Sequence, residues 1–285
     1  MSKWFLSRGM CAALVLLAVF AMLPKAVTAS HVWSTYHWRR PSAAILNIPV
    51  RRVNSAVWVA RYNTAMTDWR KPAMTKIKPF TGFTGGQAPS CPVVNGQITS
   101  CDGSYGGTGW LGLAQIWISG SHILRGRSIM NNSYFALAAY NTIPWRQLVM
   151  CQEIGHNFGL GHVNVVFGNR NVGSCMDYTS DPDGGGAYGP SNMHPYAHDY
   201  ALINTKHTHV GMEPPTLLSG PENSDLPEPT VAEPQRMVDF NGLRMENLGQ
   251  LMYSGDGGRT ERYESDFGGG HKVVTQVVWA GKKAR

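Results

Sequence analysis

The sequence predicts an α+β fold in which a mixed, twisted sheet packs against a few helices. Apolar residues at helical spacing over residues 54–69 predict one helix, and Pro72 ends it. Residues 112–118 alternate in character and predict a strand, within a group of strands over residues 111–130. Short alternating runs and glycine turns in residues 236–280 predict a β-rich C-terminal extension.

The structure expected for the other segments follows from their composition. Residues 30–52 carry scattered aromatic side chains and Arg-Arg pairs, and we expect an extended N-terminal segment there. Residues 80–110 are rich in Gly, Pro and Ser, which predicts a loop region. A second helix is predicted to begin near Pro144, because proline favours the first turn of a helix. The polar Gly/Pro stretch over residues 179–195 predicts a long loop, a candidate wall for a specificity pocket.

The first 29 residues have the pattern of a secretory signal. Lys3 and Arg8 give a positive start, and residues 10–23 form an apolar run that is too short to span a bilayer. Small residues precede the expected cleavage after Ala29. We therefore expect a secreted or periplasmic protein without membrane contact once the signal is removed.

The predicted organisation is a signal peptide over residues 1–29, a main domain over 30–211, a linker over 212–235 and the extension over 236–285. Six prolines among several acidic residues mark the linker. The net charge of +7 falls by three to +4 when the signal's three basic residues leave. Because no dense Lys/Arg cluster with interleaved aromatics is present, nucleic-acid binding is not expected. We expect a monomer.

Residues 152–162, near the middle of the chain, have the sequence QEIGHNFGLGH. The spacing of their polar side chains indicates a catalytic metal site. Two residues four apart on a helix share a face, so Gln152 and His156 can point at one metal ion. Glu153 then lies beside that ion, where a general base can take a proton from the attacking water.

The second half of this stretch returns the chain to the same place. Gly159 can adopt a left-handed conformation and end the helix. The chain then turns and brings His162 back toward the ion. Two imidazoles, one amide and an open position are typical of a catalytic metal site rather than a structural one.

The stretch resembles the zinc-binding motif H-E-x-x-H-x-x-G-x-x-H of the metzincin clan of metallopeptidases, and it matches four of the five fixed positions. The resemblance implies a metzincin-like catalytic domain over residues 30–211, with an active-site helix. It implies one Zn²⁺ ion held by Gln152, His156 and His162, and Glu153 as the catalytic base.

Further segments carry the resemblance over roughly residues 105–210. Ser174-Cys175-Met176-Asp177-Tyr178 resembles the Met-turn in the S-x-M-x-Y form. This implies that Met176 forms an apolar floor under the metal and that Tyr178 reaches the metal or the oxyanion. The run from Asp199 to Ile203 resembles the start of the family's C-terminal helix. The strand over 112–118 is either the edge strand that pairs with an extended substrate or an ordinary interior strand.

The departure from the motif is Gln152, which replaces the first histidine. A glutamine oxygen is neutral, like imidazole, but it is a weaker donor toward zinc. Three outcomes are open: Gln152 binds the metal through its oxygen, it holds a water that completes the shell, or the site binds metal too weakly to work. Copper or another transition metal also suits two imidazoles and an oxygen.

Four cysteines remain after the signal, since Cys11 lies inside it. An even number suits an oxidising compartment, and four cysteines allow three pairings. Cys91 and Cys101 bracket a short loop with an Asn-Gly turn signal, and we favour their pairing. We also favour Cys151–Cys175, which would tie the active-site helix to the Met-turn. A zinc-thiolate role is disfavoured, because no C-x-x-C spacing is present.

The function expected from these features is that of a secreted metal-dependent endopeptidase acting on polypeptides. In this interpretation Glu153 accepts a proton from the attacking water and passes it to the leaving amine, while Tyr178 assists the oxyanion. The alternative, from another class, is a non-catalytic extracellular binding protein on a degenerate peptidase fold.

Overall fold

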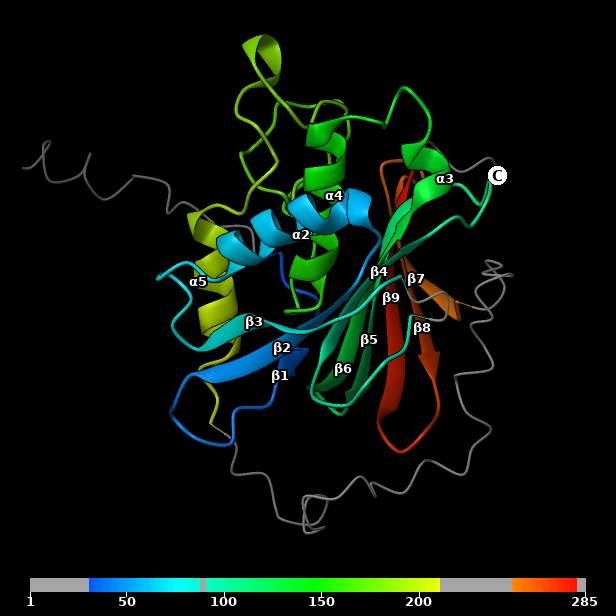
Figure 1. Ribbon diagram of the computed structural model, residues 1–285. Coiled ribbons are helices and arrows are strands. Elements are labelled where there is room, and N and C mark those ends of the chain that lie inside the picture. Colours follow the sequence, from blue (N-terminus) through cyan, green and yellow to red (C-terminus); the bar gives the residue numbers. More distant parts are fainter. Residues whose placement is uncertain (1–30, 88–90, 211–247, 281–285) are drawn as a thin grey trace, which may run out of the picture. The chain divides into compact units, whose positions relative to one another are not determined.

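A computed structural model describes residues 31–87, 91–210 and 248–280 (Figure 1). The predicted signal peptide and the predicted linker lie outside these ranges. No helix in the described ranges is both long and apolar enough to cross a bilayer.

One mixed sheet of nine strands runs through the described residues, in the order β3-β2-β4-β6-β5-β9-β8-β7, with β1 paired to β6. Its strands are β1 His37–Trp38, β2 Leu46–Val53, β3 Ile77–Thr84, β4 Ile98–Gly103, β5 Trp110–Ser119, β6 His122–Asn131, β7 Gln250–Gly255, β8 Thr260–Asp266 and β9 His271–Trp279. The strands from β3 to β6 pair in parallel, and those from β6 through β5 to β7 pair antiparallel. The predicted α+β class with a mixed sheet is confirmed.

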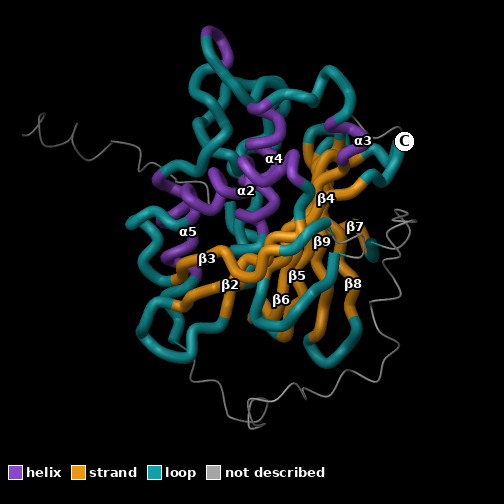
Figure 2. Tube along the Cα trace, viewed as in Figure 1, coloured by secondary structure: helices purple, strands orange, loops and turns teal. Residues whose placement is uncertain are grey.

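Helices α2 and α4 pack on the sheet and on each other (Figures 1 and 2). The helices are α2 Ala56–Trp69, α3 Asn132–Phe135, α4 Ile143–His156 and α5 Ala197–Lys206, with a 3-10 turn η1 at Gly186–Tyr188. The Thr142 side chain caps α4 by accepting from the Trp145 N–H. The helix therefore begins where Pro144 predicts it.

The loop predicted over residues 80–110 is in part wrong, because β4 lies within it. Glycines, prolines and serines surround a run of only six residues and hide its strand character. The strand is buried along its whole length and pairs in parallel with β2 and β6. Long-range pairing, which local composition does not report, decides its conformation.

The described part of the predicted C-terminal extension, residues 248–280, is β-rich and continues the main sheet. β9 pairs antiparallel with β5, and β8 and β7 follow it outward (Figure 2). Of the two roles open for β5, edge strand or interior strand, the structure has the second within the described residues.

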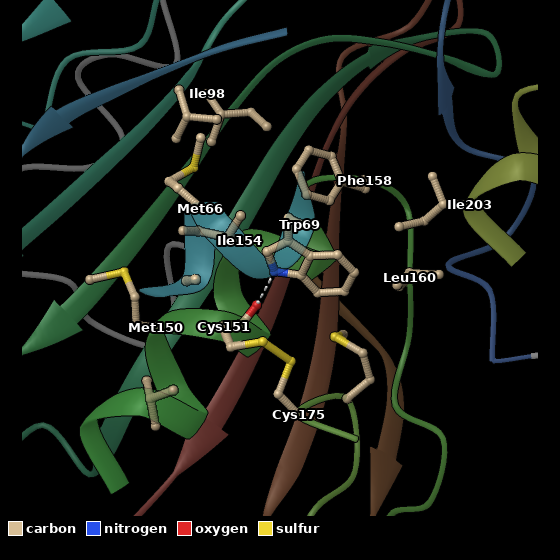
Figure 3. Close-up of a cluster of buried hydrophobic side chains, with 14 of the residues drawn as sticks. Met66, Trp69, Ile98, Met150, Cys151, Ile154, Phe158, Leu160, Cys175 and Ile203 are labelled. Atoms are coloured by element: carbon tan, nitrogen blue, oxygen red, sulfur yellow. Dashed lines mark hydrogen bonds between the residues drawn. A yellow bond between two sulfur atoms is a disulfide. The ribbon is translucent and has the colours of Figure 1, made fainter. Parts of the chain in front are cut away.

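Both predicted disulfides are present, Cys91–Cys101 and Cys151–Cys175. The second joins α4 to the turn that carries Met176, with its Cα atoms 6.0 Å apart. Figure 3 shows it inside the buried cluster, where the Trp69 indole donates a 3.1 Å hydrogen bond to the Cys151 carbonyl. Covalent and apolar contacts thus fix the same end of α4.

Replacing Cys151 and Cys175 together with alanine should lower the free energy of unfolding by about 3 kcal/mol, because the loop they close is released in the unfolded chain. Thermal unfolding should then occur roughly 6–12 °C lower for a chain of this size. Peptide mapping of the unreduced wild type should recover the Cys151–Cys175 link. An unchanged melting temperature in the double variant would contradict the stabilising role.

Candidate metal and catalytic site

The C-terminal end of α4 carries Gln152, Glu153 and His156, all fully buried. The chain turns after the helix, and Gly159 has the predicted left-handed conformation, with φ of 82°. A Cβ at this position would also lie 2.3 Å from the Tyr36 carbonyl oxygen. Conformation and space therefore both require glycine at the turn.

The turn brings the two histidines of the motif together. His156 Nε2 and His162 Nε2 lie 3.1 Å apart. Two nitrogens bound to one tetrahedral zinc, each at ~2.0–2.1 Å, lie roughly 3.3 Å from one another. The observed spacing therefore suits a shared ion.

The outer nitrogens of both rings have hydrogen-bond partners that orient them. His156 Nδ1 lies 2.8 Å from the Leu160 carbonyl oxygen, to which it donates. His162 Nδ1 lies 3.0 Å from Thr260 Oγ1 on β8, which accepts a second bond of 2.7 Å from Gln276 Nε2 on β9. Such partners leave the Nε2 lone pairs for a metal and fix each ring.

Burial also sets the charge of the pair. It lowers the pKa of His156 to about 4, although the hydrogen bond to the Leu160 carbonyl acts to raise this pKa. Burial, and after it the charge of His156, lowers the pKa of His162 well below its ordinary value. Both imidazoles are therefore neutral at neutral pH, which is the form that binds metals.

Gln152 lies one helical turn before His156. Its Nε2 donates a long bond of 3.4 Å to the Asp177 carbonyl oxygen. Its buried Oε1 has no hydrogen-bond partner in the described part of the chain. A buried oxygen without a partner is unfavourable, and binding a cation or a water would satisfy it.

The Glu153 carboxyl is buried, and neither of its oxygens has a hydrogen-bond partner among the residues described. Burial raises its pKa well above 4.5. A Cβ at Gly112 would lie 2.8 Å from Glu153 Oε1, so the backbone of β5 passes directly beside the carboxyl. A cation next to such a group would favour its ionised form and lower the pKa.

These residues fit the metal ion that the motif implies, since the donors are two neutral imidazoles, an unpartnered amide oxygen and an adjacent unpartnered carboxyl. Within residues 31–87, 91–210 and 248–280, no group of three or more His, Cys, Asp or Glu side chains is placed to hold a metal. The exchange of the first histidine for Gln152 is consistent with that result.

Met176 lies under the end of α4. It is fully buried, and its sulfur would be 2.5 Å from a Cβ at Gly155. The Ser174 hydroxyl accepts from the Met176 N–H at 2.9 Å and donates to Asp199 Oδ2 on α5 at 2.7 Å. α5 therefore holds the turn, and Gly155 is required because a side chain there would collide with the sulfur.

Tyr178 lies beside the histidines, with its ring centroid 5.7 Å from that of His162. Its hydroxyl is the donor to two backbone carbonyl oxygens, that of Arg259 at 2.5 Å and that of Trp279 at 2.9 Å. Burial raises its pKa. Assistance to an oxyanion would require this hydroxyl to leave both carbonyls.

Sequence reasoning missed Gly155, within α4, and the residues that reach the site from other elements: Gly112, Thr260 and Gln276. Thr260 stands 98 positions after His162, and no local pattern marks it. Gly155 lies inside the motif. The signal that could have found it is that a side chain at this position would collide with Met176.

No model of a known protein family matches this chain, and no curated protein matches it either.

Proposed function

We propose that this protein is a metzincin-like, metal-dependent endopeptidase. The observation that carries the proposal is the pair of neutral imidazoles with their Nε2 atoms 3.1 Å apart, beside the buried, unpartnered carboxyl of Glu153. Polypeptide is the proposed substrate, because the motif resembles that of metallopeptidases and the β5 backbone passes directly beside that carboxyl.

In this proposal His156, His162 and Gln152 hold one ion, with zinc as the first expectation and copper or another transition metal as the alternatives. A bound ion would supply Lewis-acid polarisation of the scissile carbonyl and make a water more acidic. Glu153 takes a proton from the attacking water and delivers it to the leaving amine. Tyr178 donates to the developing oxyanion once its hydroxyl is free.

The proposed location is outside the cytoplasm. Two disulfides are typical of proteins in an oxidising compartment. The predicted signal peptide would carry the chain there.

A second candidate is a non-catalytic extracellular binding protein. The engagement of the Tyr178 hydroxyl by two backbone carbonyls and the interior position of β5 favour it. Metal content discriminates between the two: the peptidase should retain close to one ion per chain when it is purified without added metal. A chain without bound metal would favour the binding protein.

Gln152→His tests whether position 152 belongs to the metal site. Imidazole is a better zinc donor than a carboxamide, so zinc affinity should rise, and any preference for another metal should weaken. Zinc affinity is measured by competition with a chromogenic chelator, at equal helix content of the two proteins.

Gln147→His is the matched control, since Gln147 is a buried glutamine on the same helix but outside the motif. It should leave zinc affinity at the wild-type value. Equal affinities for wild type and Gln152→His would remove Gln152 from the site.

A further inference from the structure

β9 lies on the one side of β5 that β6 does not occupy. The pairing is antiparallel, and it places Gly112 opposite Val278 and Ala114 opposite Gln276. The Gly112 backbone passes beside the Glu153 carboxyl. A strand that pairs with β5 on the side of β9, at the usual ~4.8 Å strand spacing, is therefore the paired chain that comes nearest to this carboxyl.

Side chains and carbonyls of β8, β9 and the turn before β8 also close over the site. We call residues 256–280 the covering hairpin. Thr260 bonds His162, and Gln276 bonds Thr260. The carbonyls of Arg259 and Trp279 hold the Tyr178 hydroxyl. The covering hairpin therefore contacts one proposed metal ligand and the proposed oxyanion donor.

Three further contacts attach the covering hairpin near its ends. The Asp256 carboxylate accepts a 3.0 Å bond from the Phe167 N–H, and the Arg259 guanidinium lies 3.9 Å above the Phe167 ring. The Tyr140 hydroxyl donates to the Ala280 carbonyl. Val274 and Val277 are fully buried, on opposite faces of β9, so the closed arrangement is strongly favoured.

We infer that β9 occupies the peptide-binding edge of β5 and that the covering hairpin holds the site closed. The inference rests on the proposed function, because it assigns β5 as the substrate strand. The substrate is an extended, strand-forming peptide segment that runs antiparallel to β5 in place of β9. Displacement of the whole covering hairpin would also free the Tyr178 hydroxyl, because the carbonyls of Arg259 and Trp279 both belong to it. Opening would therefore supply the edge and the oxyanion donor together.

A switchable lock tests the inference in the full chain. Ser119 and His271 are opposed partners on β5 and β9, away from the histidine pair. Opposed strand residues lie within disulfide range, so Ser119→Cys/His271→Cys should tie β9 to β5 on oxidation. Gln250→Cys/Glu264→Cys, on β7 and β8, is the control lock that leaves the β5–β9 pair untied.

A second variant weakens the packing of β9, which is the opposite of tying it to β5. Val277→Thr adds a hydroxyl to a fully buried position of β9, on the face of the sheet where Leu113 and Ile129 pack. Burying an unpaired hydroxyl should raise the open fraction roughly tenfold. Val50→Thr makes the same exchange at a fully buried position of β2 and is its control.

Three measurements are made on zinc-loaded protein: hydrolysis of an unstructured fluorogenic peptide, hydrogen exchange of the β5 amides, and zinc content. We expect the oxidised lock to slow hydrolysis at least tenfold relative to its reduced form, with no such difference in the control lock. Val277→Thr should speed both hydrolysis and β5 exchange about tenfold over Val50→Thr.

Equal hydrolysis by the oxidised and reduced lock, with zinc retained, would overturn the inference and leave the proposed function standing. Faster exchange in Val277→Thr without faster hydrolysis would overturn it as well. Loss of zinc from the wild type and every variant would refute the proposed function itself, and the inference with it.

Discussion

Glu153→Gln should slow peptide hydrolysis by about 10²- to 10⁴-fold, the usual contribution of a general base. The amide has nearly the shape of the carboxyl, so the packing beside Gly112 is preserved. It cannot accept a proton from the attacking water. The rate is measured with the fluorogenic peptide in the wild type and in the Val277→Thr background, where the site is expected to open more often.

The same variant reports on burial of the carboxyl through the stability of the metal-free protein. Burial raises the folded pKa of Glu153 well above 4.5, so the protonated form is the one the fold favours. Its contribution to stability is fully present below pH 4.5 and is lost as the pH rises toward the folded value. Glu153→Gln should therefore melt at a higher temperature than wild type at neutral pH, and at a similar temperature near pH 4.

Two results would contradict this assignment. Unchanged hydrolysis in Glu153→Gln would remove Glu153 from the mechanism. A melting difference that shows no dependence on pH would show that folding does not raise the pKa of this carboxyl. Zinc content should be near the wild-type value in either case, since Glu153 is not a proposed ligand.

His156→Ala and His162→Ala should each lose most of the bound metal. Imidazole nitrogen is the strongest donor in this site, and a single remaining imidazole with an amide oxygen is a poor zinc set. Loss of even an outer partner of a ligand commonly costs 10- to 100-fold in affinity, and loss of the ligand should exceed that. Elemental analysis after gel filtration gives the metal content per chain.

His209→Ala is the control for these two variants, because His209 is an exposed histidine outside the motif. It should keep the wild-type content. Full retention of metal in His156→Ala or His162→Ala would place the ion elsewhere, with His194, His198, His207 and His209 as the candidates to test next.

The sequence reports on this site where the signal is local. The spacing of Glu153, His156 and His162 follows from helix geometry and the glycine turn, and the fold brings the two histidines together as the motif predicts. The Cys151–Cys175 pairing could be predicted because each cysteine adjoins a motif residue, and the structure confirms it.

Local sequence patterns do not predict contacts between segments that lie far apart in the chain. Thr260 and Gln276 reach His162 from strands that no motif connects to it. β4 was missed because pairing with β2 and β6, rather than its own composition, fixes its conformation. The engagement of the Tyr178 hydroxyl could not be foreseen either, since it depends on where β8 and β9 join the sheet.

The position of β9 has a consequence for how the chain reaches its native state. Gln115 on β5 bonds Thr275 on β9, across 160 positions of sequence. A growing chain therefore makes β1 to β6 long before their neighbour exists, and the free side of β5 stays unpaired meanwhile. Such pairings are slow to form, and an uncovered strand recruits other chains. Refolding yield should consequently fall with protein concentration, and assembly of the central sheet should be the late, rate-limiting event.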